Sequence, residues 1–299
     1  MPMIPKRTLA ELAFYYRQTE ANGNVDLFVE GADDKLLLDR YIADRNARSC
    51  AVYTMDTIDF SGFDFVSLGL PAPSARSCVI ALRKFLSDHN VEVGKHLFLV
   101  DRDTEDLCST PLIEGVEVTD SGALPVHLYD NEVERRLADL IYAGRISPQT
   151  LKNSVTSICT DIYLIRAASK RMGLGIRILP SADFISGNAN DGFSLDIAGY
   201  LERCLHSCAL TTRHSQVMVQ IDECRTALSA ANLRKFALIN DHTLWEVLRV
   251  IGSRLGSANN RSAQDIEEMV RMTFDAAQLS GHRLFRTIEQ HVGARAEAA

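Results

Sequence analysis

The stretch Val25-Asp-Leu-Phe-Val-Glu30-Gly31 is an apolar run that ends on a glutamate and turns through a glycine, and His96-Leu-Phe-Leu-Val-Asp101-Arg-Asp103 repeats that design later in the chain. Short apolar runs bounded by turn residues are typical of buried strands. The carboxyl ends of parallel strands meet at one edge of a sheet, and ligands bind at that edge. We therefore expect Glu30, Asp101 and Asp103 to converge there.

Strand-like and helical segments alternate in the first half of the chain. Strands are expected at 25–30, 51–54, 96–100 and 124–128, and helices at 8–20, 33–46, 76–89 and 131–141. This alternation predicts an α/β fold, with a doubly wound parallel sheet flanked by helices.

The second half of the chain has a different pattern. Helical periodicity recurs at 151–170, 195–207, 217–228, 242–255, 262–279 and 282–291, and strand-like runs are confined to 177–180 and 236–239. We therefore expect two domains. The first, 1–142, would hold the sheet and an N-terminal helix, and the second, 143–299, would be mostly helical.

The composition is that of an ordinary globular protein, with 46% hydrophobic and 24% charged residues. No apolar run approaches the length of a membrane helix, and the N-terminus lacks the apolar stretch of a secretory signal. Seven scattered cysteines do not form a recognisable disulfide framework. We expect a cytoplasmic protein that does not bind a membrane.

The negative charge is concentrated in the part of the chain that carries the expected site. Residues 1–140 hold 14 Lys and Arg against 24 Asp and Glu, whereas residues 141–299 hold 18 against 15. Converging carboxylates repel one another unless a cation lies between them. Oxygen ligands suit Mg²⁺, or Mn²⁺ in its place, and such ions assist phosphodiester cleavage. The sequence therefore predicts a divalent metal site.

The motifs resemble those of a known family. A strand ending Glu-Gly followed by a strand ending Asp-x-Asp is similar to the signature of the TOPRIM domain of topoisomerases, bacterial primases, recombination proteins and OLD-type nucleases. Each motif alone is weak evidence, and their joint placement at strand ends gives the specificity. The resemblance extends to the TOPRIM effectors of bacterial anti-phage defence, such as that of the PARIS system, through Glu30-Gly-x-x-Asp34-Lys35, Asp101-Arg-Asp103, Asn131-Glu-Val-Glu134 and, loosely, Asn240-Asp-His-Thr-Leu244.

The resemblance implies a TOPRIM-like sheet in the first 140 residues and a role for each matching acid. Glu30 would act as general acid or base or as a metal ligand, and Asp101 and Asp103 would hold the metal. Asp34 falls where OLD-type members place a further acidic ligand. An acid in the first turn of a helix is also favoured by the helix dipole, so a purely structural role for Asp34 stays open.

Two further residues have both a functional and a structural interpretation. Lys35, in the first turns of its helix, would contact a scissile phosphate or extend into solvent. Glu134 would join the metal ligands or pair with Arg135 or Arg136 on the helix surface.

These features predict a Mg²⁺-dependent endonuclease that serves as the toxic effector of an anti-phage system. The resemblance favours RNA, including tRNA, over DNA as the substrate. The chain has no Gly-x-x-x-x-Gly-Lys-Ser/Thr motif, so an ABC-type or OLD-type ATPase would have to be a separate partner protein. A homo-oligomer is compatible with the sequence.

Two alternatives stay open. In the first, the chain is a non-catalytic TOPRIM interaction module that docks on an ATPase. In the second, it is a phosphotransferase or primase-like enzyme that makes phosphodiester bonds with the same metal site.

Overall fold

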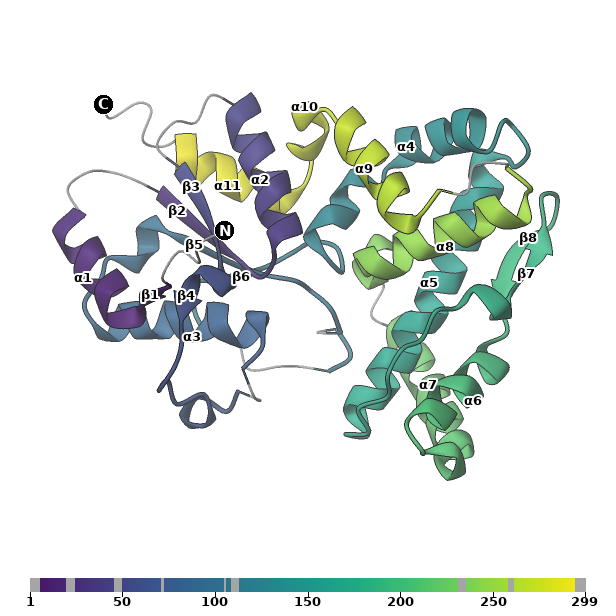
Figure 1. The fold of residues 1–299 in the computed structure, drawn as a ribbon, viewed down its shortest axis with the longest axis horizontal. Coiled ribbons are helices and arrows are strands. Elements are labelled where there is room, and N and C mark those ends of the chain that lie inside the picture. Colours follow the sequence, from purple (N-terminus) through teal and green to yellow (C-terminus); the bar gives the residue numbers. More distant parts are fainter. Residues whose placement is uncertain are drawn as a thin grey trace. The chain divides into compact units, whose positions relative to one another are not determined.

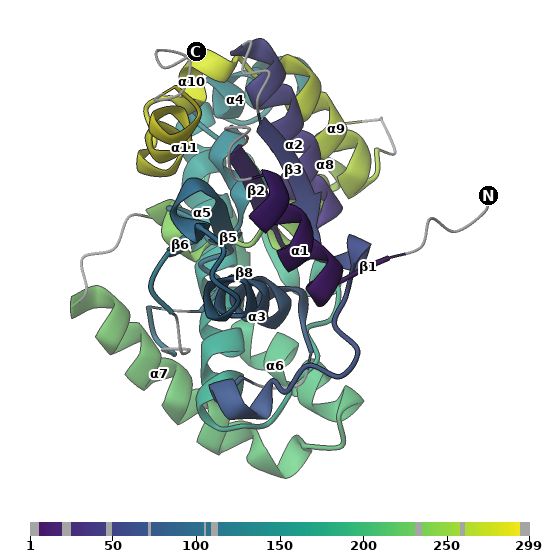
Figure 2. The ribbon, with the colours of Figure 1, turned by 90° about the vertical axis from the view of Figure 1, so that its left-hand side faces the viewer.

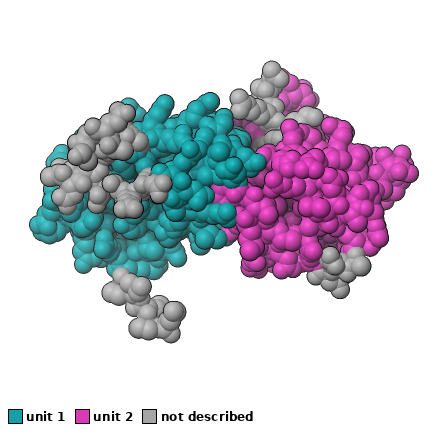
Figure 3. All heavy atoms as spheres, turned by 90° about the horizontal axis from the view of Figure 1, so that it is seen from above, with its two compact units in different colours: residues 1–101, 110–120, 275–299 teal, residues 102–109, 121–274 magenta. Residues whose placement is uncertain are grey.

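The computed structural model describes residues 6–19, 25–45, 50–70, 73–104, 106–108, 113–230, 235–257 and 261–293. The chain divides into two compact units (Figure 3). Unit 1 consists of residues 1–101, 110–120 and 275–299, and unit 2 of residues 102–109 and 121–274. Compact units need not coincide with domains that fold independently. The domain boundary expected after residue 142 therefore stays a prediction.

Unit 1 is built on a four-stranded parallel sheet in the order β3-β2-β5-β6 (Figure 1). Its strands are β2 (Val25–Val29), β3 (Cys50–Thr54), β5 (Leu97–Val100) and β6 (Val116–Val118). A separate two-stranded parallel pair is formed by β1 (Arg7–Thr8) and β4 (Ile58–Asp59). The parallel sheet, with helices on its faces and a mostly helical region after it, confirms the expected fold class.

Helices cover both faces of this sheet. α1 (Leu9–Thr19) and α3 (Ala75–Asp88) lie on one side, and α2 (Ala32–Asp44) and α11 (Arg283–Gly293) lie on the other (Figures 1 and 2). The short helix α10 (Ala276–Leu279) precedes α11. Every residue of β2 is buried, as expected for a strand of a parallel sheet covered on both faces.

The core of unit 1 follows the alternation of side chains along the strands. Phe28 of β2 and Phe98 of β5 stack with ring centroids 5.0 Å apart and pack with α1 and α3. Leu27 and Leu97, one residue earlier on each strand, are also buried and point to the opposite face. The strand pattern seen in the sequence is thus explained by burial on two sides.

The last helix of the described chain returns to the sheet. The rings of Phe285 on α11 and Tyr41 on α2 are 4.8 Å apart. Arg283 donates hydrogen bonds of 3.0 Å to the carboxylates of Glu117 on β6 and of Asp120 just after it. Unit 1 is therefore assembled from three separate segments of the sequence.

Unit 2 is mainly helical. Its helices are α4 (Asn131–Arg136), which continues as a π-helix (Leu137–Ile141), α5 (Pro148–Arg171), α6 (Ile197–Ser207), α7 (His214–Ala230), α8 (Asp241–Arg254) and α9 (Ala263–Thr273). The long helix α5 packs against α7, α8 and an antiparallel hairpin of β7 (Ile185–Asn188) and β8 (Gly192–Leu195). Ser147 caps α5, because its Oγ accepts the Thr150 N–H, and the helix begins with Pro148.

Several strand predictions were wrong. The run expected as the fourth strand is a 3₁₀-helix, Leu124–Leu128, and the fourth strand is Val116–Val118. Pro125 has no N–H to donate to a ladder, whereas Val116 and Val118 are β-branched and suit a pleated sheet. In unit 2, residues 177–180 form no regular element and 236–238 belong to a 3₁₀-helix. The hairpin of β7 and β8 was not predicted.

Two expectations from composition can be compared with the structure. All seven cysteines are free, which agrees with the absence of a disulfide pattern. Among the residues described, no helix is both long enough and apolar enough to cross a membrane.

Candidate active site

The edge of the sheet in unit 1 carries Glu30 and Asp101. Glu30 directly follows β2 and Asp101 directly follows β5, and these two strands are paired neighbours. Glu30 Oε1 accepts a hydrogen bond of 2.9 Å from the backbone N–H of Asp101. Both residues are partly exposed. The fold therefore brings these two predicted residues together, and their role in metal binding stays a prediction.

The start of α3 adds a cation at this edge that was not predicted from the sequence. Arg76 lies in the first turn of α3 and donates a hydrogen bond to the carbonyl oxygen of Asp101. Ser74 fixes this turn, because its Oγ accepts the Ser77 N–H at 3.1 Å. A basic residue in the first turn of a helix is unfavourable because of the helix dipole. An arginine at this position of an expected helix could therefore have been noticed in the sequence.

Asp34 has a structural contact at the turn after Glu30. Its Oδ2 accepts the backbone N–H of Gly31 at 3.0 Å, and the side chain is 7% exposed. This contact satisfies a backbone donor at the start of α2, as capping side chains do. The structure therefore supports the structural interpretation of Asp34, and its role as a metal ligand stays a prediction.

Lys35 is held by local contacts. Its Nζ donates a hydrogen bond of 2.7 Å to the carbonyl oxygen of Val52 on β3 and lies 2.8 Å from the Asp39 carboxylate. To contact a phosphate, Lys35 would have to exchange these partners. Its predicted role in the reaction stays a prediction.

Asp103 belongs to unit 2, and its backbone conformation is unusual. Its φ of 42° lies in the left-handed region that residues other than glycine rarely adopt. Its N–H donates to the carbonyl oxygen of Gly122 at 3.0 Å. A Cβ added to Gly122 would lie 2.1 Å from the carbonyl oxygen of Ile239, so only glycine permits this close approach. Such conformations persist where the surroundings impose them, and they concentrate at functional sites.

Asp103 lines a small polar cavity of unit 2. The cavity has a volume of about 10 Å³, which is close to what one water molecule needs. Within the described part of the chain, Tyr163 Oη, Arg166 Nε and Asn240 Oδ1 are buried without a hydrogen-bond partner, and all three residues line this cavity. Buried polar atoms are nearly always satisfied, so the cavity suits a small polar group.

The sequence contained only part of the signal for this cavity. Asn240 lies in the element for which the sequence suggested a loose match to the anti-phage effectors. Tyr163 and Arg166 lie three residues apart on α5 and therefore share one face of that helix. Polar groups on the otherwise apolar face of a buried helix could have been noticed, but their closeness to Asp103 depends on the tertiary fold.

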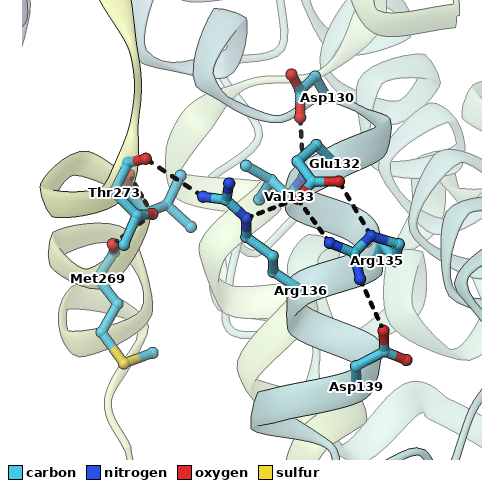
Figure 4. Close-up of polar contacts among 9 residues, drawn as sticks. Asp130, Glu132, Val133, Arg135, Arg136, Asp139, Met269 and Thr273 are labelled. Atoms are coloured by element: carbon cyan, nitrogen blue, oxygen red, sulfur yellow. Dashed lines mark hydrogen bonds and ion pairs between the residues drawn. The ribbon is translucent and has the colours of Figure 1, made fainter.

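Glu134 does not pair with the arginines that follow it. Arg135 and Arg136 donate hydrogen bonds of 2.7 and 2.9 Å to Glu132, one turn earlier, and Arg135 also donates to Asp139. Figure 4 shows these contacts. Glu134 itself is 2% exposed. The interpretation of Glu134 as a surface partner of these arginines is therefore wrong.

Glu134 is instead a buried carboxyl group with an incomplete set of partners. Its Oε2 lies 3.5 Å from Lys152 Nζ on α5. No described residue forms a hydrogen bond with its Oε1. Burial raises the pKa of Glu134 to about 7, against the opposing effect of Lys152. Its role as a metal ligand stays a prediction.

The opposite end of the sheet holds a second buried acid, Asp26. Tyr16 Oη donates a hydrogen bond of 2.6 Å to its carboxylate, and its own N–H donates to His96 Nδ1 at 3.3 Å. Burial raises the pKa of Asp26, although the hydrogen bond from Tyr16 lowers it. Because this group lies at the amino ends of β2 and β5, it is a structural cluster distinct from the Glu30 edge.

No protein-family model matches this chain, and no curated protein is significantly similar to it.

Proposed function

We propose that this protein is a metal-dependent endonuclease in which Glu30 and Asp101 hold Mg²⁺ or Mn²⁺. The observation that carries the proposal is the hydrogen bond from the backbone N–H of Asp101 to the Glu30 carboxylate, at the carboxyl ends of two adjacent parallel strands. Open parallel sheets bind ligands at that edge. Three further parts of the proposal rest on the resemblance to TOPRIM effectors: RNA such as tRNA as the preferred substrate over DNA, a role in anti-phage defence, and control by a separate ATPase.

The donor chemistry fits a hard divalent cation. Glu30 and Asp101 offer carboxylate oxygens, which Mg²⁺ prefers. When bound, such an ion would polarise the phosphoryl group and lower the pKa of the attacking water. Asp34, Asp103 and Glu134 are proposed as further ligands, and Lys35 as a phosphate contact, on the resemblance alone.

Cleavage of tRNA and of plasmid DNA by the purified protein in Mg²⁺ or Mn²⁺ tests this proposal. We expect Glu30→Gln and Asp101→Asn each to reduce cleavage by about 100-fold or more, the scale of losing a positioned acid–base group. Asp88→Asn is the control, because Asp88 forms an exposed pair with Lys84. A wild-type protein that cuts neither substrate, with or without an ATPase partner, would contradict the proposal.

Thermal unfolding provides a readout that does not depend on activity. An ion that binds only the folded state raises the Tm of a protein. We expect Mg²⁺ to raise the Tm of the wild type. Asp101→Asn should remove that gain and leave the metal-free protein folded. An equal gain in the variant would show that the metal binds elsewhere.

The alternative is a non-catalytic interaction module, and one observation favours it. Glu30 accepts the Asp101 N–H, which is a structural use of the carboxylate. Glu30→Gln keeps an acceptor oxygen and nearly the same volume. A protein that only docks on a partner should therefore keep its cellular phenotype in this variant, whereas a nuclease should lose it.

A further inference from the structure

A cavity lies within unit 2, where α8 ends and α9 begins. Its volume is about 580 Å³, which falls in the range of small-molecule sites. Its lining includes Ile141, Tyr142, Arg249, Gly252, Arg261 and Ile266. None of these residues belongs to the predicted metal site.

The charged residues of the lining are two arginines. Among the described residues, Arg249 has no ion-pair or hydrogen-bond partner, and Arg261 donates only to the thioether sulfur of Met269, at 3.1 Å. A thioether is a weak acceptor. The segment 258–260 is Ala-Asn-Asn and supplies no carboxylate. Arg261 also interacts electrostatically with the Asp265 carboxylate of α9. Arg249 has no acidic partner among the described residues, so the lining retains a guanidinium group that favours an anionic ligand.

The start of α9 adds neutral donors. Ser262 caps α9 and accepts the Asp265 N–H with its Oγ at 3.1 Å. The Asp265 carboxylate in turn accepts the Ser262 N–H at 2.6 Å, so this acid already occupies part of the helix start. The remaining backbone N–H groups of the first turn lack intrahelical partners and carry partial positive charge. The carbonyl groups at the end of α8 are partly occupied, because Gly252 O accepts both the N–H and the Oγ–H of Ser257. The negative end of α8 is thus partly shielded from the cavity.

One wall of the cavity is rigid and apolar. Tyr142 is 1% exposed, and its Oη donates to Leu248 O at 2.8 Å. A Cβ on Gly252 would lie 2.8 Å from the Tyr142 ring, so glycine is needed for α8 to pack this closely. Ile141 and Ile266 extend the apolar side of the lining. The cavity therefore combines a cationic side with an apolar side.

We propose that this cavity binds a phosphorylated small molecule of the nucleotide class. Its phosphate would lie on Arg249 and Arg261, and its organic part would lie along Ile141, the partly exposed apolar side chain of the lining. The site is independent of Glu30 and Asp101, so its test does not depend on nuclease activity.

The experiment titrates the full chain with inorganic phosphate, pyrophosphate and nucleoside mono- and diphosphates. Calorimetry measures the affinity, and thermal unfolding measures the change in Tm. We expect a nucleotide to bind more tightly than phosphate and to raise the Tm. Arg249→Gln and Arg261→Gln should each weaken binding at least tenfold. Arg254→Gln is the matched control, because Arg254 donates to Ala182 O and does not line the cavity.

Three outcomes would overturn the proposal. The first is no saturable binding of any probe by the wild type. The second is equal affinity in the three arginine variants. The third is binding of an oligonucleotide, but of no mononucleotide, that depends on Arg249 and Arg261, because the cavity would then belong to a nucleic-acid path. If the variants do not fold, modification of wild-type arginines by an arginine-specific reagent decides the matter, since the nucleotide should protect Arg249 and Arg261 but not Arg254.

Discussion

The sheet edge of unit 1 and the small cavity of unit 2 each hold one of two aspartates that are only two residues apart in sequence. At the sheet edge, Glu30 accepts a hydrogen bond from the backbone N–H of Asp101, and neither residue has a positive φ. In the cavity, Asp103 has a positive φ, and Tyr163, Arg166 and Asn240 each have a buried atom without a partner among the described residues. A regular strand end positions its acid through ordinary ladder geometry, whereas the cavity depends on close contacts from three separate segments.

The largest expected effect comes from breaking the close contact that supports Asp103. Gly122→Ala places a methyl group against the carbonyl oxygen of Ile239, so the backbone has to move. Overpacking costs about 1–3 kcal/mol in typical cases and more when a backbone must shift, and we expect a loss of about 3 kcal/mol. Urea unfolding measures it, and hydrogen exchange should show lost protection at the Asp103 amide.

Gly94→Ala is the matched control for this prediction. A Cβ on Gly94 has no atom within 4 Å, so its effect should be within about 1 kcal/mol. Equal effects of the two substitutions would show that the strained contact at Gly122 is not needed for Asp103.

A smaller effect is expected at the buried acid of α4. Lys152→Met removes the cation that lies beside Glu134. Leaving a buried acceptor without its partner costs about 1–3 kcal/mol, measured by urea unfolding. Lys84→Met is the control, because Lys84 pairs with Asp88 where both side chains are exposed, and exposed pairs contribute about 0–1 kcal/mol. A loss no larger than that of the control would mean that Glu134 does not need Lys152.

The smallest effect is a change of stability with pH at the other end of the sheet. Burial raises the pKa of Asp26 in the folded protein above its value of 3.8 in the unfolded chain. The folded state therefore holds this proton more tightly, and stability is lost as the pH rises from 3.8 through the folded pKa. Asp26→Asn removes this loss and can still accept the hydrogen bond from Tyr16. The stability of Asp26→Asn relative to the wild type should increase between pH 3.8 and the folded pKa of Asp26, and should stay constant at higher pH.

Asp59→Asn is a control of opposite sign. The hydrogen bonds from Ser61 lower the pKa of Asp59, so Asp59 contributes stability above 3.8 that is lost as the pH falls through its folded pKa. The Asp59→Asn variant should be less stable than the wild type at neutral pH, and the difference in stability should shrink as the pH falls. Denaturant unfolding between pH 3 and 7 measures the stability of both variants relative to the wild type. If the two stability differences change with pH in the same direction, the opposite pKa shifts of Asp26 and Asp59 are contradicted.

The contrast between a regular strand end and a cavity formed by distant segments also explains which features could be predicted from the sequence. β2 and β5 were predicted because apolar runs ending on acids are a local signal, and their pairing places Glu30 beside Asp101. The strand Val116–Val118 was missed because it is short and is surrounded by polar residues. Leu124–Leu128 was assigned to a strand from its apolar content alone, and Pro125 should have weighed against that assignment.

The parts of the candidate site that were missed depend on tertiary contacts. Arg76 reaches the Asp101 carbonyl from α3, and Tyr163 and Arg166 share a cavity with Asp103 from α5. Such contacts join residues that are far apart in sequence and follow no period. Lys35 shows the converse, because its position next to the motif was clear but its contacts with Val52 and Asp39 were not.

The return of α11 to the sheet has a consequence for synthesis on the ribosome. Arg283 is 163 residues beyond Asp120, its partner at the end of β6. At roughly 5–20 residues per second, the ribosome needs on the order of ten to thirty seconds to make that stretch. During this time the sheet is already translated but lacks one of its covering helices. We therefore expect the nascent sheet to expose apolar surface until α11 has been synthesised, and chaperones bind such surface.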